Sequence, residues 1–170
     1  SYTEFVNPFI GTDFTGNTYP GAQAPFGMVQ LSPDNGLPGW DRISGYFYPD
    51  STIAGFSHTH LSGTGAGDLY DISFMPVTLP YKEAEAPLGI HSLFSHSEES
   101  ASAGYYRVRL KDYDINVELT ATERCGIQRY TFPKADAVVF LNLRKAMNWD
   151  FTNDSYIEAV DSVTVQGYRY

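Results

Sequence analysis

The sequence predicts an all-β domain, an antiparallel β-sandwich with long loops rich in glycine and proline. In the second half, apolar and polar residues alternate over several short adjacent segments, as they do in half-buried strands. In the first half, clusters of Gly, Pro, Asn and Asp separate the apolar segments, which is typical of turns between strands. Helical periodicity is almost absent, and the best candidate, KEAEA at 82–86, ends at Pro87. An α+β domain is the alternative.

Three strands are predicted in the first half. Residues 28–33 (MVQLSP) alternate, and residues 51–61 (STIAGFSHTHL) form a strand that leads into a glycine-rich loop. Residues 71–77 (DISFMPV) form the third strand. One face of this third strand carries Ile72, Phe74 and Pro76.

The strand pattern is clearer in the second half. Residues 105–113 (YYRVRLKDY) and 115–122 (INVELTAT) each place apolar side chains on one face and polar side chains on the other. Residues 137–143 (AVVFLNL) are almost continuously apolar, which predicts a strand at the centre of a sheet. The remaining strands, which are predicted to complete a meander, are 125–132, 155–161 and 162–170.

The chain ends at Tyr170 inside a predicted strand, which is unusual for a natural domain, so we expect residues 1–170 to form one domain of a larger protein. Its length is sufficient for one sizeable core. The single cysteine, Cys125, excludes an intrachain disulfide, so the fold depends on that core. No apolar stretch is long enough for a transmembrane helix, and no signal peptide is visible at the N-terminus, which starts abruptly at Ser1.

Composition narrows the classes of partner. Charged residues make up only 18% of the chain, and the formal net charge is −9 at pH 7. Nucleic acids and anionic membranes both favour Lys and Arg, so neither is expected as a partner. Aromatic residues reach 15%, including 13 Tyr, whose rings pack while their hydroxyls form hydrogen bonds. This composition suits an all-β domain or a surface that stacks on sugars.

The stretch GFSHTHLSGTGAGDLYDI at 55–72 contains the densest group of residues that can do chemistry. His58 and His60 would lie on one face of a strand, and Asp68 or Asp71 could complete a metal site. However, a His-x-His pair is common, and no third histidine follows at a persuasive spacing. Histidines that form hydrogen bonds within a packed loop explain the pair equally well.

Two further interpretations of this stretch are weak. Its alternate glycines give G-x-G-x-G, but no helix follows whose N-terminus could bind a phosphate. The pair Gly55-x-Ser57 begins like a nucleophile elbow, but Thr59 stands where the closing glycine is needed. The strand–turn–helix context of such an elbow is also missing.

The wall of a carbohydrate site explains the stretch best. Its glycines let the backbone approach a ligand, while its Ser, Thr, His and Asp residues offer donors and acceptors to sugar hydroxyls. Nearby, GLPGWDR (36–42) supplies Trp40, whose surrounding turn residues favour an exposed ring over a core position. Asp41 and Arg42 beside it could contact a ligand or form a simple ion pair within the turn.

Several long segments resemble one known family. VNPFIGT (6–12), TYPGAQAPFGMVQLSPD (18–34) and SGYFYPDSTIAGFSHTHLSGTGAGDLYDISFMP (44–76) are similar, in this order, to the N-terminal domain of glycoside hydrolase family 92. Members of this family are bacterial α-mannosidases. Looser similarity, which includes YRVRL, ELTATERCGIQRYTF and VVFLNL, continues to the end of the chain.

The resemblance implies an N-terminal β-sandwich followed by a larger (α/α)6-barrel domain. It implies a calcium-dependent, inverting exo-α-mannosidase that releases mannose, chiefly α-1,2-linked, from N-glycans or mannan. Inversion needs a general acid and a general base about 6.5–9.5 Å apart. In the family, these carboxylates and the Ca²⁺ ligands lie on the barrel. Residues 1–170 are therefore expected to contain no catalytic residue and no metal ligand, and to be inactive alone.

The resemblance also implies roles for individual residues. The ring of Trp40 is expected to stack on the leaving-group sugar, and Asp68 and Asp71 are expected to organise their loop. The loops that carry these residues are expected to contact the missing barrel domain. The expected substrate-binding and interface residues are Trp40, Asp41, Arg42, His58, His60, Ser62, Gly63, Thr64 and Asp68. The family's substrates imply a periplasmic, secreted or cell-surface location in a bacterium.

Two rival functions follow from the residues themselves. A tyrosine-rich β-sandwich would also suit a self-sufficient carbohydrate-binding module, which would bind mannose or mannobiose without a second domain. A metal-dependent β-domain enzyme would use His58 and His60 as ligands.

Overall fold

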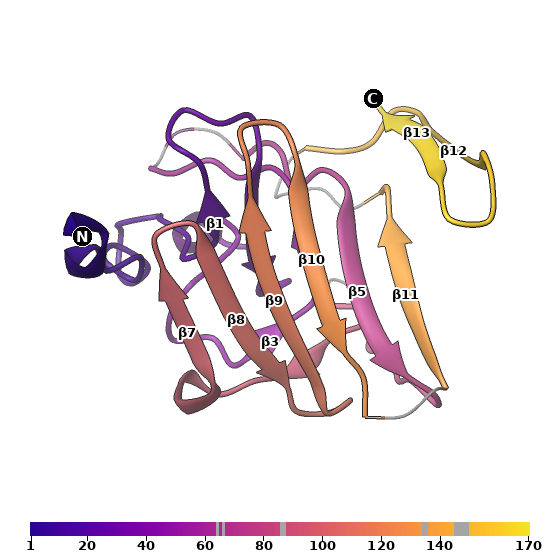
Figure 1. The fold of residues 1–170 in the computed structure, drawn as a ribbon, viewed down its shortest axis with the longest axis horizontal. Helices are drawn as coiled ribbons and strands as arrows, with labels where there is room; N and C mark the ends of the chain where they lie inside the picture. The colour runs from indigo at the N-terminus through magenta and orange to yellow at the C-terminus, as the bar shows by residue number, and fades with distance from the viewer. Residues whose placement is uncertain (64, 66, 86–87, 134–135, 145–149) are drawn as a thin grey trace.

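The computed structural model of the protein describes residues 1–63, 65, 67–85, 88–133, 136–144 and 150–170. Its long elements are β-strands, and all pairings between them are antiparallel (Figure 1). Helical structure among these residues is limited to three short 3-10 helices, η1 (Tyr2–Phe5), η2 (Trp40–Arg42) and η3 (His96–Glu98). None of the described helices is long and apolar enough to cross a membrane. The predicted all-β, antiparallel class is confirmed.

The described strands form two main sheets. The five-stranded sheet has the order β1 (Ala22–Gln23), β2 (Gln30–Asp34), β4 (Gly55–Ser57), β5 (Ser73–Thr78), β11 (Ala137–Asn142). The four-stranded sheet has the order β10 (Gly126–Thr131), β9 (Ile115–Ala121), β8 (Tyr105–Leu110), β7 (Glu99–Ser102). Two small sheets pair β3 (Thr52–Ile53) with β6 (Ser92–Leu93), and β12 (Ser155–Ala159) with β13 (Val165–Arg169). In Figure 1, β7–β10 lie in front of β1, and β5 and β11 lie to the side of β10.

The core lies between the two main sheets. In β8 and β9, the inward side chains are buried and alternate with more exposed ones, and Val108 lies opposite Val117. Strand β9 packs against β1, β2 and β5 of the other sheet, where Leu31, Phe56 and Val77 are fully buried. Burial of each such side chain stabilises the fold by about 1.5–3 kcal/mol. This face-to-face packing confirms the predicted β-sandwich.

The alternation at 71–77 does not reveal which side of β5 is buried. Ile72 lies outside the strand, and Phe74 is only half-buried. Met75 and Val77, from the opposite face, belong to the core. Since side chains on both faces of β5 are buried, a simple alternation of burial is absent. The helix candidate at 82–86 is not helical at 82–85, and Ala86 lies outside the described residues.

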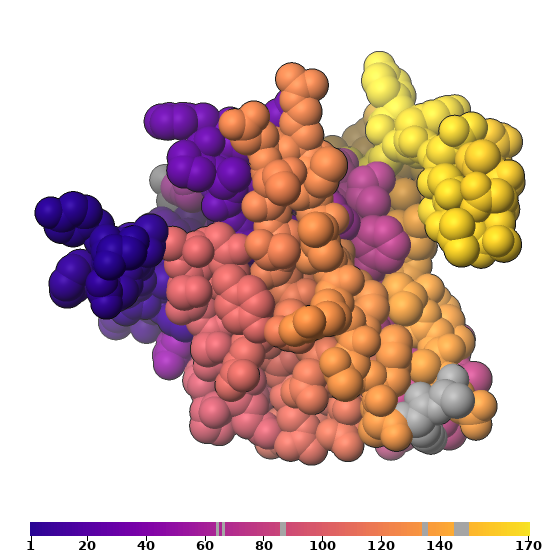
Figure 2. Space-filling model, viewed as in Figure 1, coloured from indigo at the N-terminus to yellow at the C-terminus, as the bar shows by residue number. Residues whose placement is uncertain are grey.

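Three predictions about strand arrangement are wrong. Residues 137–143 were expected at the centre of a sheet, but β11 is an edge strand, and Val139 is 42% exposed. The apolar residues of β11 therefore do not indicate that a strand pairs with it on each side. The single strand expected at 51–61 divides at Ala54 into β3 and β4, which belong to different sheets. The strands at 155–161 and 162–170 form a separate hairpin, which protrudes from the body of the molecule (Figure 2).

A buried carboxylate connects the loops to the four-stranded sheet. The side chain of Glu99, at the start of β7, is 1% exposed. It accepts hydrogen bonds from the hydroxyls of Tyr46 (3.0 Å) and Tyr106 (2.6 Å) and lies 2.7 Å from Nδ1 of His96. Burial, reinforced by the negative charge of Glu99, raises the pKa of both tyrosines, so their hydroxyls keep their protons and donate.

We expect Glu99→Ala to lower the free energy of unfolding by about 2–4 kcal/mol, because two buried tyrosine hydroxyls lose their acceptor. Urea denaturation measures the change. Glu98→Ala is the matched control, since Glu98 only accepts a surface hydrogen bond from Arg109, and it should change stability little. Equal losses in the two variants would contradict the structural role of the buried carboxylate.

Candidate functional site

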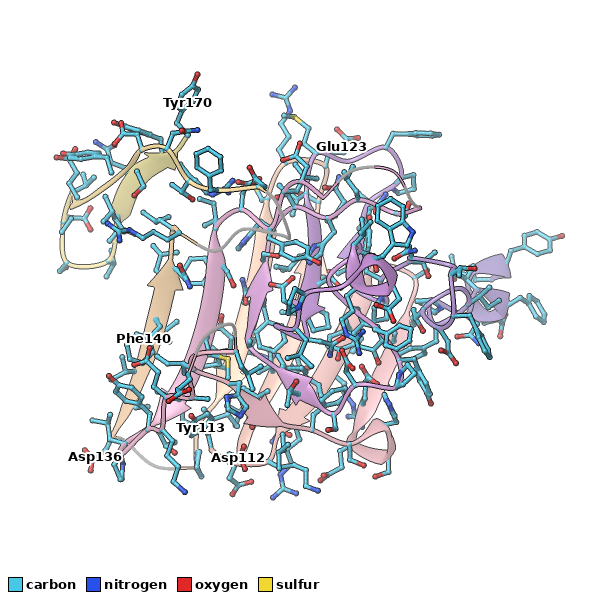
Figure 3. All side chains as sticks on the ribbon, turned by 180° about the vertical axis from the view of Figure 1, so that it is seen from behind. Asp112, Tyr113, Glu123, Asp136, Phe140 and Tyr170 are labelled. Carbon is cyan, nitrogen blue, oxygen red and sulfur yellow. The ribbon has the colours of Figure 1, made fainter. Side chains whose placement is uncertain are left out.

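The predicted site residues that the structure describes lie in loops at one end of the sandwich. Glu123, in the turn between β9 and β10, marks this end in Figure 3, and Asp112 and Tyr113 mark the opposite end. The turn between β1 and β2 joins Glu123 through a hydrogen bond from Met28 N to Glu123 O (2.7 Å). The site is therefore built from connections that converge on one edge of both sheets.

Asn17 connects three of these loops, although it was not among the predicted site residues. Its carbonyl oxygen accepts a hydrogen bond from Gly63 N at 2.7 Å. When the side-chain amide of Asn17 is oriented with its nitrogen toward the Trp40 turn, it donates hydrogen bonds to Trp40 O (3.2 Å) and Asp41 O (3.3 Å). The loop at 12–19, the Trp40 turn and the glycine-rich loop therefore form one cluster.

The backbone of this end is held in sparsely populated conformations. Among the described residues, seven non-glycine residues have positive φ, and only Asp114 of these lies in the turn at the opposite end. The other six are Phe14, Asn17, Phe26, Leu69, Tyr70 and Ile72. Left-handed conformations cost about 1–2 kcal/mol per residue and persist where the surroundings impose them, as at binding and active sites. The strain supports a functional role for this end.

His60 braces the cluster from within. Its residue is 3% exposed, and its Nε2 lies 2.8 Å from Asp34 Oδ1 and 3.1 Å from Ser57 Oγ. Its Nδ1 lies 2.6 Å from the carbonyl oxygen of Gln30. Because both ring nitrogens are engaged by protein groups, His60 is placed to hold the loop in position and not to face a ligand directly.

His58 points into different surroundings from His60. Its Nδ1 lies 2.9 Å from the carbonyl oxygen of Ile72, and its ring meets Phe74 edge-on at 5.6 Å. Its other edge faces Gly126 of β10, between the sheets. Burial lowers the pKa of the His58 imidazole, which favours its neutral form. Among the described residues, no three His, Cys, Asp or Glu side chains converge to hold a metal ion.

Hydrogen bonds of Arg42 hold the Trp40 turn in place, and the turn presents the indole. Trp40 is 56% exposed, as the sequence predicted from its turn context. Arg42 forms two hydrogen bonds to Asp50 (2.6 and 2.7 Å) and one to Asp41 (2.8 Å), and its guanidinium lies 4.6 Å from the centre of the Phe47 ring. Asp41 and Arg42 therefore form the turn ion pair that the sequence left as one alternative, and Asp50 is a partner it did not identify.

The remaining predicted residues lie on the exposed rim of the cluster. Ser62 and Gly63 are exposed, and Asp68 is exposed and accepts a hydrogen bond from Leu69 N at 2.7 Å. That bond agrees with the expected role of Asp68 in organising the loop. Thr64 lies outside the described residues.

Asp71 connects this loop to other parts of the domain, whereas Asp68 bonds to the backbone amide of the next residue. It accepts a hydrogen bond from the Thr59 hydroxyl at 2.7 Å and an ion-pair hydrogen bond from Arg169 of β13. Arg169 also donates to Asp150 at 2.8 Å. The C-terminal hairpin is thus fixed to the glycine-rich loop by charge-assisted bonds, which are among the stronger hydrogen bonds in proteins.

A hollow of about 760 Å³ adjoins the cluster. Its walls include Leu37 and Pro38 of the Trp40 loop, the buried Tyr70, and Met75 of β5. Phe140 of β11, labelled in Figure 3, lies beside Met75 as its cross-strand partner and continues this lining. This volume is within the range of small-molecule sites, and the mixed polar and apolar lining is compatible with a sugar.

Fold and loop cluster together define the class of domain: an antiparallel β-sandwich whose site loops converge at one end (Figure 3). A family model described as the glycosyl hydrolase family 92 N-terminal domain matches residues 5–170. The chain belongs to this family. The resemblance noted in the sequence is therefore confirmed.

Solved structures and a curated relative agree with this assignment. A family GH92 alpha-mannosidase from Bacteroides thetaiotaomicron is 42% identical, with a TM-score of 0.92 over 98% of this chain and 23% of its own. A family GH92 inverting mannosidase from the same organism is 28% identical, with a TM-score of 0.77 over 99% of this chain and 22% of its own. An uncharacterized secreted glycosidase from Arthroderma benhamiae is 27% identical over 140 residues, 78% of this chain and 18% of that protein. The chain spans less than a quarter of the length of each of these relatives.

Gly45→Ala should lower the free energy of unfolding by about 2–4 kcal/mol, because a Cβ at this position would be overpacked. It would lie 2.9 Å from Asp34 Oδ1 and His60 Cδ2 and 3.0 Å from Tyr70 Cε1, in a backbone with φ +90°. Gly104→Ala is the control, with φ +77° and no atom within 4 Å, and should cost about 1 kcal/mol. Equal costs in chemical denaturation would show that the packing around His60 is not tight.

Stability should fall as the pH decreases from about 7 to about 5, because the unfolded state takes up a proton at His58 before the folded state does. The His58 pKa is lowered by burial, so this stability is present above the unfolded pKa and is lost below it. His58→Asn should flatten this part of the profile in urea denaturation at several pH values. His91→Asn is the control. Identical profiles for wild type and His58→Asn would show that His58 does not cause this pH dependence of stability.

Proposed function

We propose that the chain is the N-terminal domain of a calcium-dependent, inverting exo-α-mannosidase whose acid and base lie on a C-terminal barrel domain. Family membership and the names of the similar proteins, an α-mannosidase and an inverting mannosidase, support this proposal. The observation that carries the role of this domain is Trp40, an exposed indole on a turn that Arg42 and Asn17 hold in place.

The carboxylates of the cluster are placed for structural roles. Asp41 pairs with Arg42, Asp68 caps the Leu69 amide, and Asp71 bonds Thr59 and Arg169. A general acid or base must instead reach the glycosidic oxygen or the attacking water. This arrangement supports a division of labour in which the other domain supplies both catalytic carboxylates.

In this proposal the domain forms one wall of the site for the leaving-group sugar. The indole of Trp40 stacks on that sugar, and Ser62, Gly63 and Asp68 lie on the rim where polar contacts form. His58 and His60 brace the wall, and Asp41 and Arg42 fix the turn. Thr64 belongs to the same stretch and is a further candidate for the rim.

In this proposal, Ca²⁺ binds to the barrel domain. Within the part of this chain that the structure describes, no cluster of three or more potential ligands is present. Bound Ca²⁺ needs six to eight oxygen ligands and can stabilise charge in the reacting sugar. This chain's own contribution is to orient the leaving group and to exclude water from one side of it.

The proposed substrates are α-mannosides, chiefly α-1,2-linked units of N-glycans or mannan. We propose that the enzyme acts outside the bacterial cytoplasm, in the periplasm, at the cell surface or after secretion, where such glycans are met. The secreted glycosidase among the relatives supports an exported enzyme. A stand-alone carbohydrate-binding domain is the alternative, because the exposed Trp40 would serve that function as well.

The proposal is tested by mannose release from α-1,2-mannobiose, with Ca²⁺ and with EDTA. The 170-residue chain, shown to be folded by circular dichroism, should release none, while the enzyme that includes the barrel should be active only with Ca²⁺. Release by the short chain would overturn the division of labour and make Asp41, Asp68 and Asp71 the first residues to mutate. Mannobiose binding by the short chain, with no activity in the longer enzyme, would favour the binding module.

In the two-domain enzyme, Trp40→Ala should raise KM for mannobiose about tenfold or more, because the stacking surface for the leaving group is lost. Steady-state kinetics measures this change. Leu93→Ala, which shortens a 44% exposed side chain beside Asp112 at the opposite end of the sandwich, should change KM little. Unchanged KM in Trp40→Ala would place the leaving-group site elsewhere.

A further inference from the structure

A second hollow lies beside the N-terminal segment and is lined by residues that the proposed mannosidase site does not use. It encloses about 330 Å³ and is bounded by Asn7, Phe9, Asp13, Tyr48, His96 and Glu99, among others. We propose that this hollow binds one neutral pyranose unit, as a carbohydrate site additional to the wall at Trp40. Its volume lies at the lower end of the range for small-ligand sites, which suits a single sugar ring.

Aromatic rings form the main walls of this hollow. Tyr48 and His96 stack with ring centres 3.9 Å apart and planes 7° from parallel. Phe9 meets the Tyr48 ring edge-on at 6.0 Å and 76°. Tyr48 is nevertheless 38% exposed and lines the hollow, so part of its aromatic side chain is available to a ligand. Such a surface suits the C–H face of a pyranose, which is its apolar side.

This aromatic wall is held in place before any ligand arrives. Both ring nitrogens of His96 are engaged, Nδ1 with Glu99 (2.7 Å) and Nε2 with the Tyr48 carbonyl oxygen (2.7 Å). Glu99 is in turn fixed by the hydroxyls of Tyr46 and Tyr106. A preorganised wall loses little side-chain freedom on binding, which favours weak ligands such as monosaccharides.

Polar groups with opposite hydrogen-bonding roles complete the hollow. Asn7 Oδ1 accepts from Phe9 N (3.0 Å), and Asp13 Oδ1 accepts from Phe14 N (2.7 Å), which orients both side chains. The Asn7 amide nitrogen and the second Asp13 oxygen supply a donor and an acceptor, the combination that sugar hydroxyls require. The carboxylates of Asp13 and Glu99 disfavour an anionic sugar, so the expected ligand is neutral.

Titration of the 170-residue chain with methyl α-mannopyranoside, followed by NMR, tests the site. Saturable shifts are expected in the His96 imidazole and in the amides of residues 7–13 and Tyr48. Tyr48→Ala should weaken binding about tenfold or more. Tyr81→Ala is the matched control, because Tyr81 is 40% exposed and meets Phe140 edge-on at 4.9 Å, and its affinity should match wild type.

The proposal is overturned by shifts confined to the Trp40 turn and residues 58–63, by no saturable shift at His96, or by equal loss in both tyrosine variants. Equal shifts with glycerol, which has no ring face, would also overturn it. If Tyr48→Ala does not fold, the wild-type shifts and a Trp40→Ala variant still test whether the sugar binds in this hollow. Trp40→Ala should leave the His96 response unchanged. Because the readout is binding and not mannose release, failure of the proposed enzymatic function would leave this result standing.

Discussion

The buried pair formed by His60 and Asp34 is the interaction on which the loop end of this domain depends. Their side chains are 0% and 1% exposed, and burial of polar groups is favourable only when their hydrogen bonds are satisfied. Ser57 and the carbonyl oxygen of Gln30 complete the bonding of His60. Since these partners come from β2, from β4 and from the loop after β4, the ends of two paired strands and the glycine-rich loop share one arrangement.

That single arrangement explains the shape of the surrounding loops. Tyr19 and Tyr70 pack against the His60 ring at 5.2 and 5.4 Å, and Tyr70 donates its hydroxyl to the carbonyl oxygen of Arg42 at 2.8 Å. The Trp40 turn is therefore connected to the buried pair through one tyrosine. Arg42 pairs with both Asp41 and Asp50, which leaves one net negative charge in the turn, and the cluster presents an indole and small polar groups beside it. Such a surface is suited to a neutral sugar.

The parts of this fold that sequence could predict are those in which neighbouring residues carry the information. Alternation predicted β8 and β9 because only one face of each strand is buried, and the glycines and prolines around Trp40 predicted its exposure. The apolar composition of β11 did not indicate that it lies at an edge, because the same apolar run can form a central strand or an edge strand. Likewise, Asn17 and Asp34 act through contacts with residues 23 to 46 positions away in the chain, and no local pattern marks them.

The bond between Arg169 and Asp71 joins residues 98 positions apart and connects the β12–β13 hairpin to the glycine-rich loop. The Arg169 side chain is only 9% exposed, so salt screens this contact less than it screens a surface ion pair. By thermodynamic reciprocity, any ligand that favours one conformation of the loop also favours the hairpin position that pairs with it, and a shift of the hairpin alters the affinity of the loop equally. A displacement of the hairpin must therefore either carry the loop with it or break this ion pair.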